Sequence, residues 1–130
     1  MFFYRTAKLN RLSMHSTKTL LAAIVDFDIY LNSDHAFIAS IKLLHLDQIL
    51  TLGGEEIFSG ECCNDSRYFL HFLKRCMAVN QVEKIQDLLG LAVKVQVVNE
   101  EIIGISSLAA QDWFFPITEF NALKQITKLR

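Results

Sequence analysis

Hydrophobic and polar residues alternate with a period of two near the start of the chain. Residues 19–31 are rich in β-branched and aromatic side chains, and the alternation is regular from Ile24 onward. This spacing is typical of a β-strand with one covered face and one solvated face. It predicts that Ile24, Asp26, Asp28 and Tyr30 share one face of a strand.

Two further strands are predicted to follow the first in an antiparallel meander. The short polar residues 32–34 favour a turn, because such side chains bond to their own backbone, and residues 35–44 resume an apolar run. A third apolar run, residues 49–52, ends at the pair Gly53 and Gly54, which is typical of a tight turn or bulge.

The hydrophobic period changes to 3.6 residues after the helix-capping residues Asn64, Asp65 and Ser66. One helix face then carries the apolar residues Phe69, Phe72, Leu73 and Cys76. A shorter helical turn is predicted over residues 82–88, and Gly90 suits the left-handed position past its end.

The last third of the chain predicts a second hairpin and a closing helix. Residues 92–98 and 102–106 form the strands, and Asn99-Glu100 forms the turn between them. Thr118 is predicted to cap a helix with Phe120, Leu123 and Ile126 turned inward. The chain is therefore expected to be α+β, an antiparallel sheet of about five strands in the order βββα(α)ββα with a helix packed on one face.

Composition places the chain among cytoplasmic globular proteins. It has 130 residues, of which 52% are hydrophobic and 21% are charged, which is enough for one core and one domain. We expect residues 1–17 to be an N-terminal extension and residues 18–130 to be a single domain. Three cysteines are a poor disulfide framework, and the apolar run 20–25 is too short to cross a membrane.

The balanced net charge of −1 conceals an uneven distribution. Residues 1–25 hold four basic and no acidic residues, whereas residues 26–65 hold eight acidic residues and only Lys42 as a base. Acidic side chains on a strand surface attract a basic partner. The predicted partner-binding acidic face consists of Asp26, Asp28, Asp34, Glu55 and Glu56.

No group of residues in the sequence specifies a reaction. Cys62 and Cys63 are adjacent, which is poor spacing for a zinc site, and Gly53-Gly54 lacks the lysine of a phosphate-binding loop. We therefore expect no catalytic residues, no metal site, no cofactor and no enzymatic activity. The alternative is a small hydrolase or metal-dependent enzyme that uses Asp26 and Asp28, whose carboxylates share a strand face.

Direct nucleic-acid binding is not expected. The N-terminus mixes Phe2, Phe3 and Tyr4 with the bases Arg5, Lys8 and Arg11, as stacking and phosphate contacts would require. The acidic stretch 26–65 opposes this function, because phosphate neutralisation dominates non-specific binding.

Several motifs resemble a family of small, mostly uncharacterised bacteriophage and prophage proteins. Residues 82–95 are similar to its pattern of Val-Asp, an apolar residue, Leu, Gly and Val-basic-Val. Residues 101–105 and 112–116 are similar to its Lys-Ile-Ile-Gly-Ile and Asp-Trp-Phe-x-Pro motifs. In the first half, Asp34-His35 and Gly53-Gly54 match more loosely, and Ala36 stands where the family has glycine.

The resemblance covers about residues 18–120 and carries no catalytic residue. Its motifs are interpreted as structural, with Trp113 and Phe114 as anchors and Pro116 at the end of a strand.

The expected function is stoichiometric binding to a host protein or nucleoprotein complex in the bacterial cytoplasm. The phage context, which comes only from the resemblance, makes a counter-defence, anti-CRISPR-like inhibitor one form of this function. A self-associating structural protein is the competing hypothesis. In that case residues 35–44 would lie on a sheet edge and pair with their own copy in a homodimer.

Overall fold

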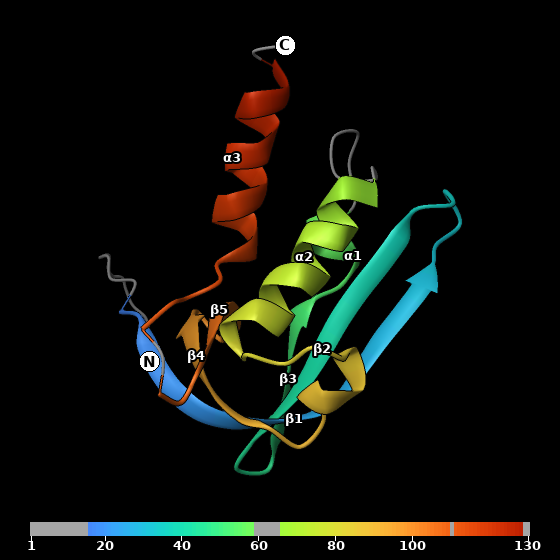
Figure 1. The fold of residues 1–130 in the computed structure, drawn as a ribbon. Helices are drawn as coiled ribbons and strands as arrows, with labels where there is room; N and C mark the ends of the chain where they lie inside the picture. Colours follow the sequence, from blue (N-terminus) through green and yellow to red (C-terminus); the bar gives the residue numbers. More distant parts are fainter. Residues whose placement is uncertain (1–15, 59–65, 110, 129–130) are drawn as a thin grey trace.

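The computed structural model describes residues 16–58, 66–109 and 111–128 (Figure 1). Its elements are β1 (Lys18–Leu31), β2 (Phe37–His45), β3 (Gln48–Gly53), α1 (Glu55–Phe58), α2 (Ser66–Val79), the 3₁₀ turn η1 (Ile85–Leu88), β4 (Ala92–Val98), β5 (Glu101–Ser107) and α3 (Pro116–Lys128). The strands form one antiparallel sheet. The predicted α+β class, five strands and order βββα(α)ββα are confirmed.

The long strand β1 joins the two halves of the sheet, whose strand order is β3-β2-β1-β4-β5. Its first part, residues 18–23, pairs with β4, and its later part, residues 23–31, pairs with β2. Because one strand belongs to both pairings, the first three strands and the later hairpin share a single core.

A β-bulge at Val25 changes which side chains of β1 face the core. Ile24 pairs with Leu43, but Asp26 pairs with Lys42, so Val25 is an extra residue on β1. Adjacent residues of β2 point to opposite faces, and Ile24 and Asp26 therefore do so too. Ile24 is fully buried, whereas Asp26 is exposed. The prediction that these two residues share a face is wrong, while Asp26 and Asp28 do share one.

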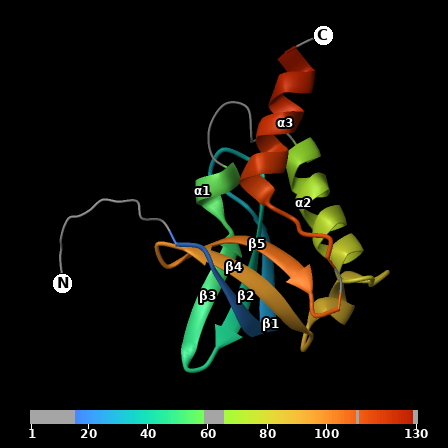
Figure 2. The same ribbon diagram turned by 90° about the vertical axis from the view of Figure 1, so that its left-hand side faces the viewer.

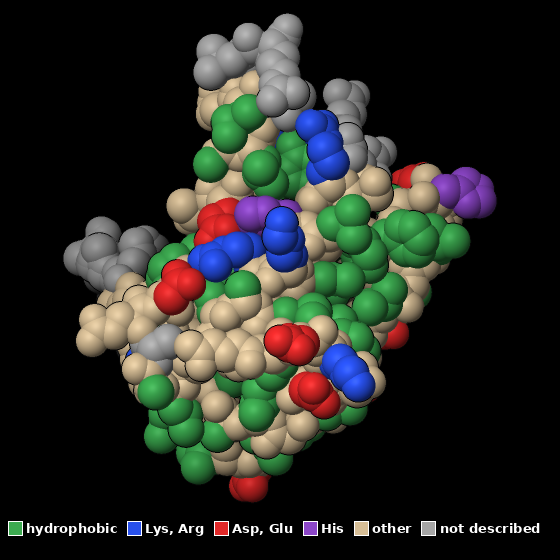
Figure 3. Space-filling view, in the orientation of Figure 1, with side chains coloured by type: hydrophobic (Ala, Val, Ile, Leu, Met, Phe, Trp, Pro, Cys, Tyr) green, Lys and Arg blue, Asp and Glu red, His purple; other side chains and the backbone are tan. Residues whose placement is uncertain are grey.

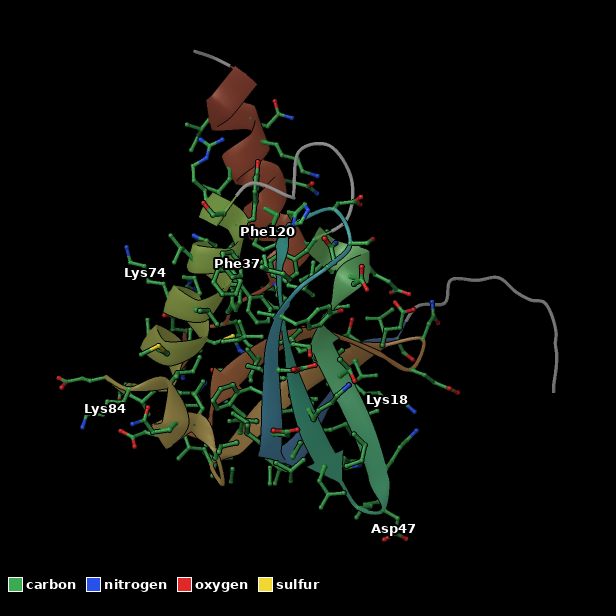
Figure 4. All side chains as sticks on the ribbon, turned by 90° about the vertical axis from the view of Figure 1, so that its right-hand side faces the viewer. Lys18, Phe37, Asp47, Lys74, Lys84 and Phe120 are labelled. Carbon is green, nitrogen blue, oxygen red and sulfur yellow. The ribbon has the colours of Figure 1, made fainter. Side chains whose placement is uncertain are left out.

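Helix α2 covers the core side of the sheet (Figure 1), with the predicted residues Phe69, Phe72 and Cys76 buried. The Phe72 ring meets the Phe58 ring edge to face at 5.5 Å and the Phe114 ring at 5.6 Å. Such aromatic pairs add about 1 kcal/mol each beyond the area they bury. Phe120 lies in this same interior, whereas Phe37 is 44% exposed and its ring stacks on that of Phe69 at 5.0 Å (Figure 4).

The sheet curves until its two edge strands face each other. Each neighbouring pair in the order β3-β2-β1-β4-β5 is antiparallel, so β3 and β5 run in the same direction. Figure 2 shows β5 crossing near the end of β3, and residues of both strands line one groove of about 350 Å³. A fold of this kind does not by itself assign a function.

The segment before α3 differs from its prediction. Pro116 begins α3 instead of ending a strand, because its fixed φ suits the first turn of a helix and its missing N–H is not needed there. Thr118 lies inside this first turn. Phe120 is buried as predicted, but Ile126 is 53% exposed, so the inward face predicted for this helix is too long.

Strand β2 lies between β1 and β3. It is therefore not an edge strand, and the proposed homodimer through residues 35–44 loses its structural basis. The edges belong to β3 and β5. The predicted helical turn over residues 82–88 is shorter than expected, because only η1 is helical, and Gly90 follows with a φ of +87°.

Gly53 offers a test of the packing between β2, β3 and α2. It has a φ of +98°, and a Cβ at this position would lie 2.6 Å from the Ala39 carbonyl oxygen and 2.9 Å from the Phe72 ring. We expect Gly53→Ala to lower the free energy of unfolding by more than about 2 kcal/mol, because backbone strain and overlap add. Urea denaturation measures the change.

Gly54→Ala is the matched control. Gly54 has a similar φ of +95°, but nothing lies within 4 Å of its added Cβ. This variant should show only the backbone cost, about 1 kcal/mol. Equal losses in the two variants would contradict the close packing at Gly53.

Candidate functional site

The first candidate surface is the face of β1–β3 turned away from the core, which we call the outer face. It carries Asp26 and Asp28, which pair in register with Lys42 and Ser40 of β2. The Lys42 ammonium donates a hydrogen bond of 3.2 Å to Thr51 Oγ1 on β3. Lys42 therefore places a positive charge beside Asp26, within the predicted acidic face.

Glu55 joins this face from α1, which follows β3 directly. The Tyr30 hydroxyl donates to Glu55 Oε2 at 3.1 Å, and the Asn32 amide donates to Oε1 at 3.4 Å. Partial desolvation raises the pKa of Tyr30, and the hydrogen bond and charge of Glu55 and the charge of Asp28 raise it further. Asp28, Tyr30 and Glu55 are thus electrostatic neighbours although α1 lies far along the sequence from β1.

Asp34 and Glu56 lie apart from this group. Asp34 is in the β1–β2 turn, where the Asn32 side-chain oxygen accepts hydrogen bonds from the backbone N–H groups of Asp34 and Ala36. Glu56 lines the groove between β3 and β5 together with Glu100 and Glu101. The structure therefore brings together Asp26, Asp28 and Glu55, and it separates the other two predicted residues from them.

Exposed apolar side chains continue the outer face toward the β2–β3 turn. Leu44 pairs with Ala23 and Ile49, and Leu21 lies two residues before Ala23 on the same face. Leu21 is 64% exposed and Ile49 is 54% exposed. Sequence reasoning missed this patch, because an apolar strand residue carries no sign of which face is covered.

A second cluster connects α2 with α3 and the segment before it. Arg75 Nε donates to Glu119 Oε1 at 3.0 Å, and its Nη2 atom donates to the Trp113 carbonyl at 3.0 Å. His71 Nε2 lies 2.7 Å from the same Glu119 oxygen, and Asp112 approaches Arg75 at 3.4 Å. Figure 3 shows basic, acidic and histidine side chains meeting on this side of the molecule.

The Arg75 cluster is best explained as a structural clamp. The hydrogen bond to Glu119 raises the pKa of Arg75 further above its normal value, so the guanidinium stays charged. The neighbouring thiol of Cys76 is fully buried, and desolvation raises its pKa strongly, which keeps it protonated and unreactive. The cluster therefore pairs the charged side chains of Arg75 and Glu119, and the neighbouring Cys76 is not an activated nucleophile.

The side chains that could bind a metal ion are not grouped together in the described part of the chain. Within residues 16–58, 66–109 and 111–128, no three His, Cys, Asp or Glu side chains are grouped so that they could hold a metal ion. Cys62 and Cys63 lie outside these residues. Asp26 and Asp28 share a strand face, where Asp26 pairs in register with Lys42 and Asp28 pairs with Ser40.

Comparisons with known proteins give no family for this chain. No protein-family model matches it, and neither the curated proteins nor the solved structures contain a significant match. None of the helices in the described residues has the length and apolar character needed to span a membrane.

The titration of Tyr30 tests the geometry of the acidic group. We expect Glu55→Gln to lower the pKa of Tyr30 toward its normal value, because the hydrogen bond and the negative charge are both weakened. Asp28→Asn should lower it less, since Asp28 acts only through its charge. Site-resolved NMR of the tyrosine rings measures the pKa, and Asp34→Asn is the control that should leave it unchanged.

The Arg75 clamp is tested by its carboxylate partner. Glu119→Gln should destabilise the protein by about 1 kcal/mol, a value reduced from that of a buried charged hydrogen bond because both side chains are partly exposed. Urea denaturation and amide hydrogen exchange in α3 measure the loss. Lys74→Ala is the control, because Figure 4 shows Lys74 pointing away from the body of the protein; an equal effect in both variants would exclude the clamp.

Proposed function

We propose that the protein is a non-enzymatic binding module whose outer face contacts a basic surface of another protein. The observation that carries this proposal is the combination, on one sheet face, of exposed apolar residues with carboxylates. Leu21, Leu44 and Ile49 form the apolar part. Asp26, Asp28 and Glu55 form the charged part.

Protein interfaces commonly combine an apolar centre with a polar rim. Exposed apolar patches rimmed by polar residues are often sites of protein–protein interaction. The outer face has both properties, so burial of Leu21 and Ile49 would supply affinity. Asp26, Asp28 and Glu55 would steer a basic partner into the correct orientation.

A protein partner is favoured over an oligonucleotide. Binding of single-stranded nucleic acid requires a positively charged surface that follows the phosphate backbone. The outer face holds one base, Lys42, between Asp26 and Thr51. Negative charge repels phosphates, so the same location fits a basic protein surface better.

The biological setting is proposed from the motif resemblance alone. In this setting the protein is a phage- or prophage-derived accessory protein that acts in the cytoplasm of a bacterial host. A host factor that handles nucleic acid has the basic surface required, and inhibition of such a factor would be an anti-CRISPR-like, counter-defence function. The metal-dependent enzyme alternative at Asp26 and Asp28 gains no support, because the nearby Lys42 ammonium competes with a bound cation.

Charge reversal tests the proposal. The variant Asp26→Lys/Asp28→Lys should weaken partner retention from host lysate at least ten-fold at low salt, because like charges then meet at the interface. High salt should weaken the unaltered protein in the same direction, since exposed charges are screened. Quantitative mass spectrometry of the retained proteins measures both effects.

The control variant reverses the exposed residues Glu83 and Asp87 near η1, which changes the net charge equally but away from the outer face. A second variant, Leu21→Ser/Ile49→Ser, tests the apolar part and should also lose the partner. If a retained partner binds all three variants as it binds the unaltered chain, the outer face is not the interface.

A further inference from the structure

The groove between β3 and β5 runs along two open strand edges. Its β3 wall is formed by residues 50–53 and its β5 wall by residues 100–103, with Ile57, Pro116 and Ile117 closing its end. Among the described residues, β3 pairs only with β2, and β5 has one further bridge, between Ile105 and Phe114. Backbone N–H and C=O groups on both walls are therefore available to a ligand chain.

The chemistry of the groove specifies a basic and apolar segment. Leu50, Leu52 and Ile102 make much of its lining apolar, while Glu56, Glu100 and Glu101 are the only charged residues that line it within the described part of the chain. Three carboxylates and no base attract a positively charged segment, and the apolar walls require hydrophobic side chains between those charges.

The chain itself contains such a segment, and its described part begins close to the groove. Ser16, where the described chain begins, lines a neighbouring pocket of about 470 Å³ together with Glu100. Glu100 also lines the groove, so the two cavities adjoin. The fifteen residues before Ser16 contain no acidic residue. They contain the bases Arg5, Lys8 and Arg11 and the large apolar residues Phe2, Phe3, Tyr4, Leu9 and Leu12.

We propose that residues 2–12 bind in the groove between β3 and β5 of their own chain, along its open strand edges. Arg11 is five residues before Ser16, and an extended chain of that length reaches about 17 Å. This is enough to pass Glu100 and follow the edge of β3. The bases then lie against Glu56, Glu100 and Glu101, and the intervening apolar residues contact Ile102 and Ile57.

This inference does not depend on the proposed function, because the groove and the outer face are different surfaces. The outer face is on the exposed side of β1–β3, whereas the groove follows the edges of β3 and β5. A chain whose own segment fills the groove has one fewer surface open to other partners. The groove would then be an intramolecular site, and the outer face would be the intermolecular one.

Limited proteolysis of the full chain tests the proposal. Chymotrypsin cleaves after Tyr4, Leu9 and Leu12, and intact mass spectrometry follows each cut. We expect cleavage at least ten-fold slower than in a synthetic peptide of residues 1–17. The variant Glu100→Lys/Glu101→Lys should approach the peptide rate, because its groove repels the segment.

Combining that variant with Arg5→Glu, Lys8→Glu and Arg11→Glu reverses both sides and should restore protection, judged against a peptide with the same three changes. Glu83→Lys/Asp87→Lys is the control with the same change of net charge, and it should stay protected. Cleavage of the unaltered chain at the peptide rate would overturn the proposal. Protection that disappears on dilution would overturn it as well, because a second copy would then supply the segment.

Discussion

The bend of β1 at Val25 is the constraint on which the rest of the structure depends. One 14-residue strand must pair with β4 at its beginning and β2 at its end, while both pairings enclose the same core. Without the bulge, Asp26 would lie on the same face of β1 as Ile24, and its carboxylate would be buried. The extra residue moves Asp26 outward and lets Phe27 pair with Ile41 on the core side. Burial of an unpaired carboxylate is far more costly than one bulge.

The bulge also brings the sheet edges together. Bulges increase local twist and bend the strand that contains them, and β1 is the central strand of the order β3-β2-β1-β4-β5. A bend at the centre moves both edges toward the same side, where α2 fills the interior with Phe72 and Cys76. This curvature produces both the groove between β3 and β5 and the clamp at Arg75, since each joins elements that are distant along the chain.

The sequence predicted the elements well because their signals are local. The helical spacing from Phe69 to Cys76 and the strand over residues 92–98 depend on side chains only a few residues apart. The position of Pro116 was misread for the same reason, since a proline fits both the end of a strand and the first turn of a helix. The bulge was missed because Val25 is an ordinary strand residue, and only the pairing of Ile24 with Leu43 and Asp26 with Lys42 reveals it.

Surfaces were harder to predict than elements, because charge along a sequence is not charge in space. Glu55 and Glu56 are adjacent, yet Glu55 bonds to Tyr30 on the outer face while Glu56 lines the groove with Glu101. Glu100 lies in the turn before β5 and Glu101 begins β5, and neither belongs to the acidic stretch 26–65. The fold places both in one groove with Glu56, and Glu100 also lines a pocket with Ser16, where the described chain begins. The chain therefore has two acidic surfaces, the outer face and the groove, and their shapes differ. The outer face is a broad sheet surface, which favours a folded partner. The groove is narrow and lies between strand edges, which favours a single extended segment.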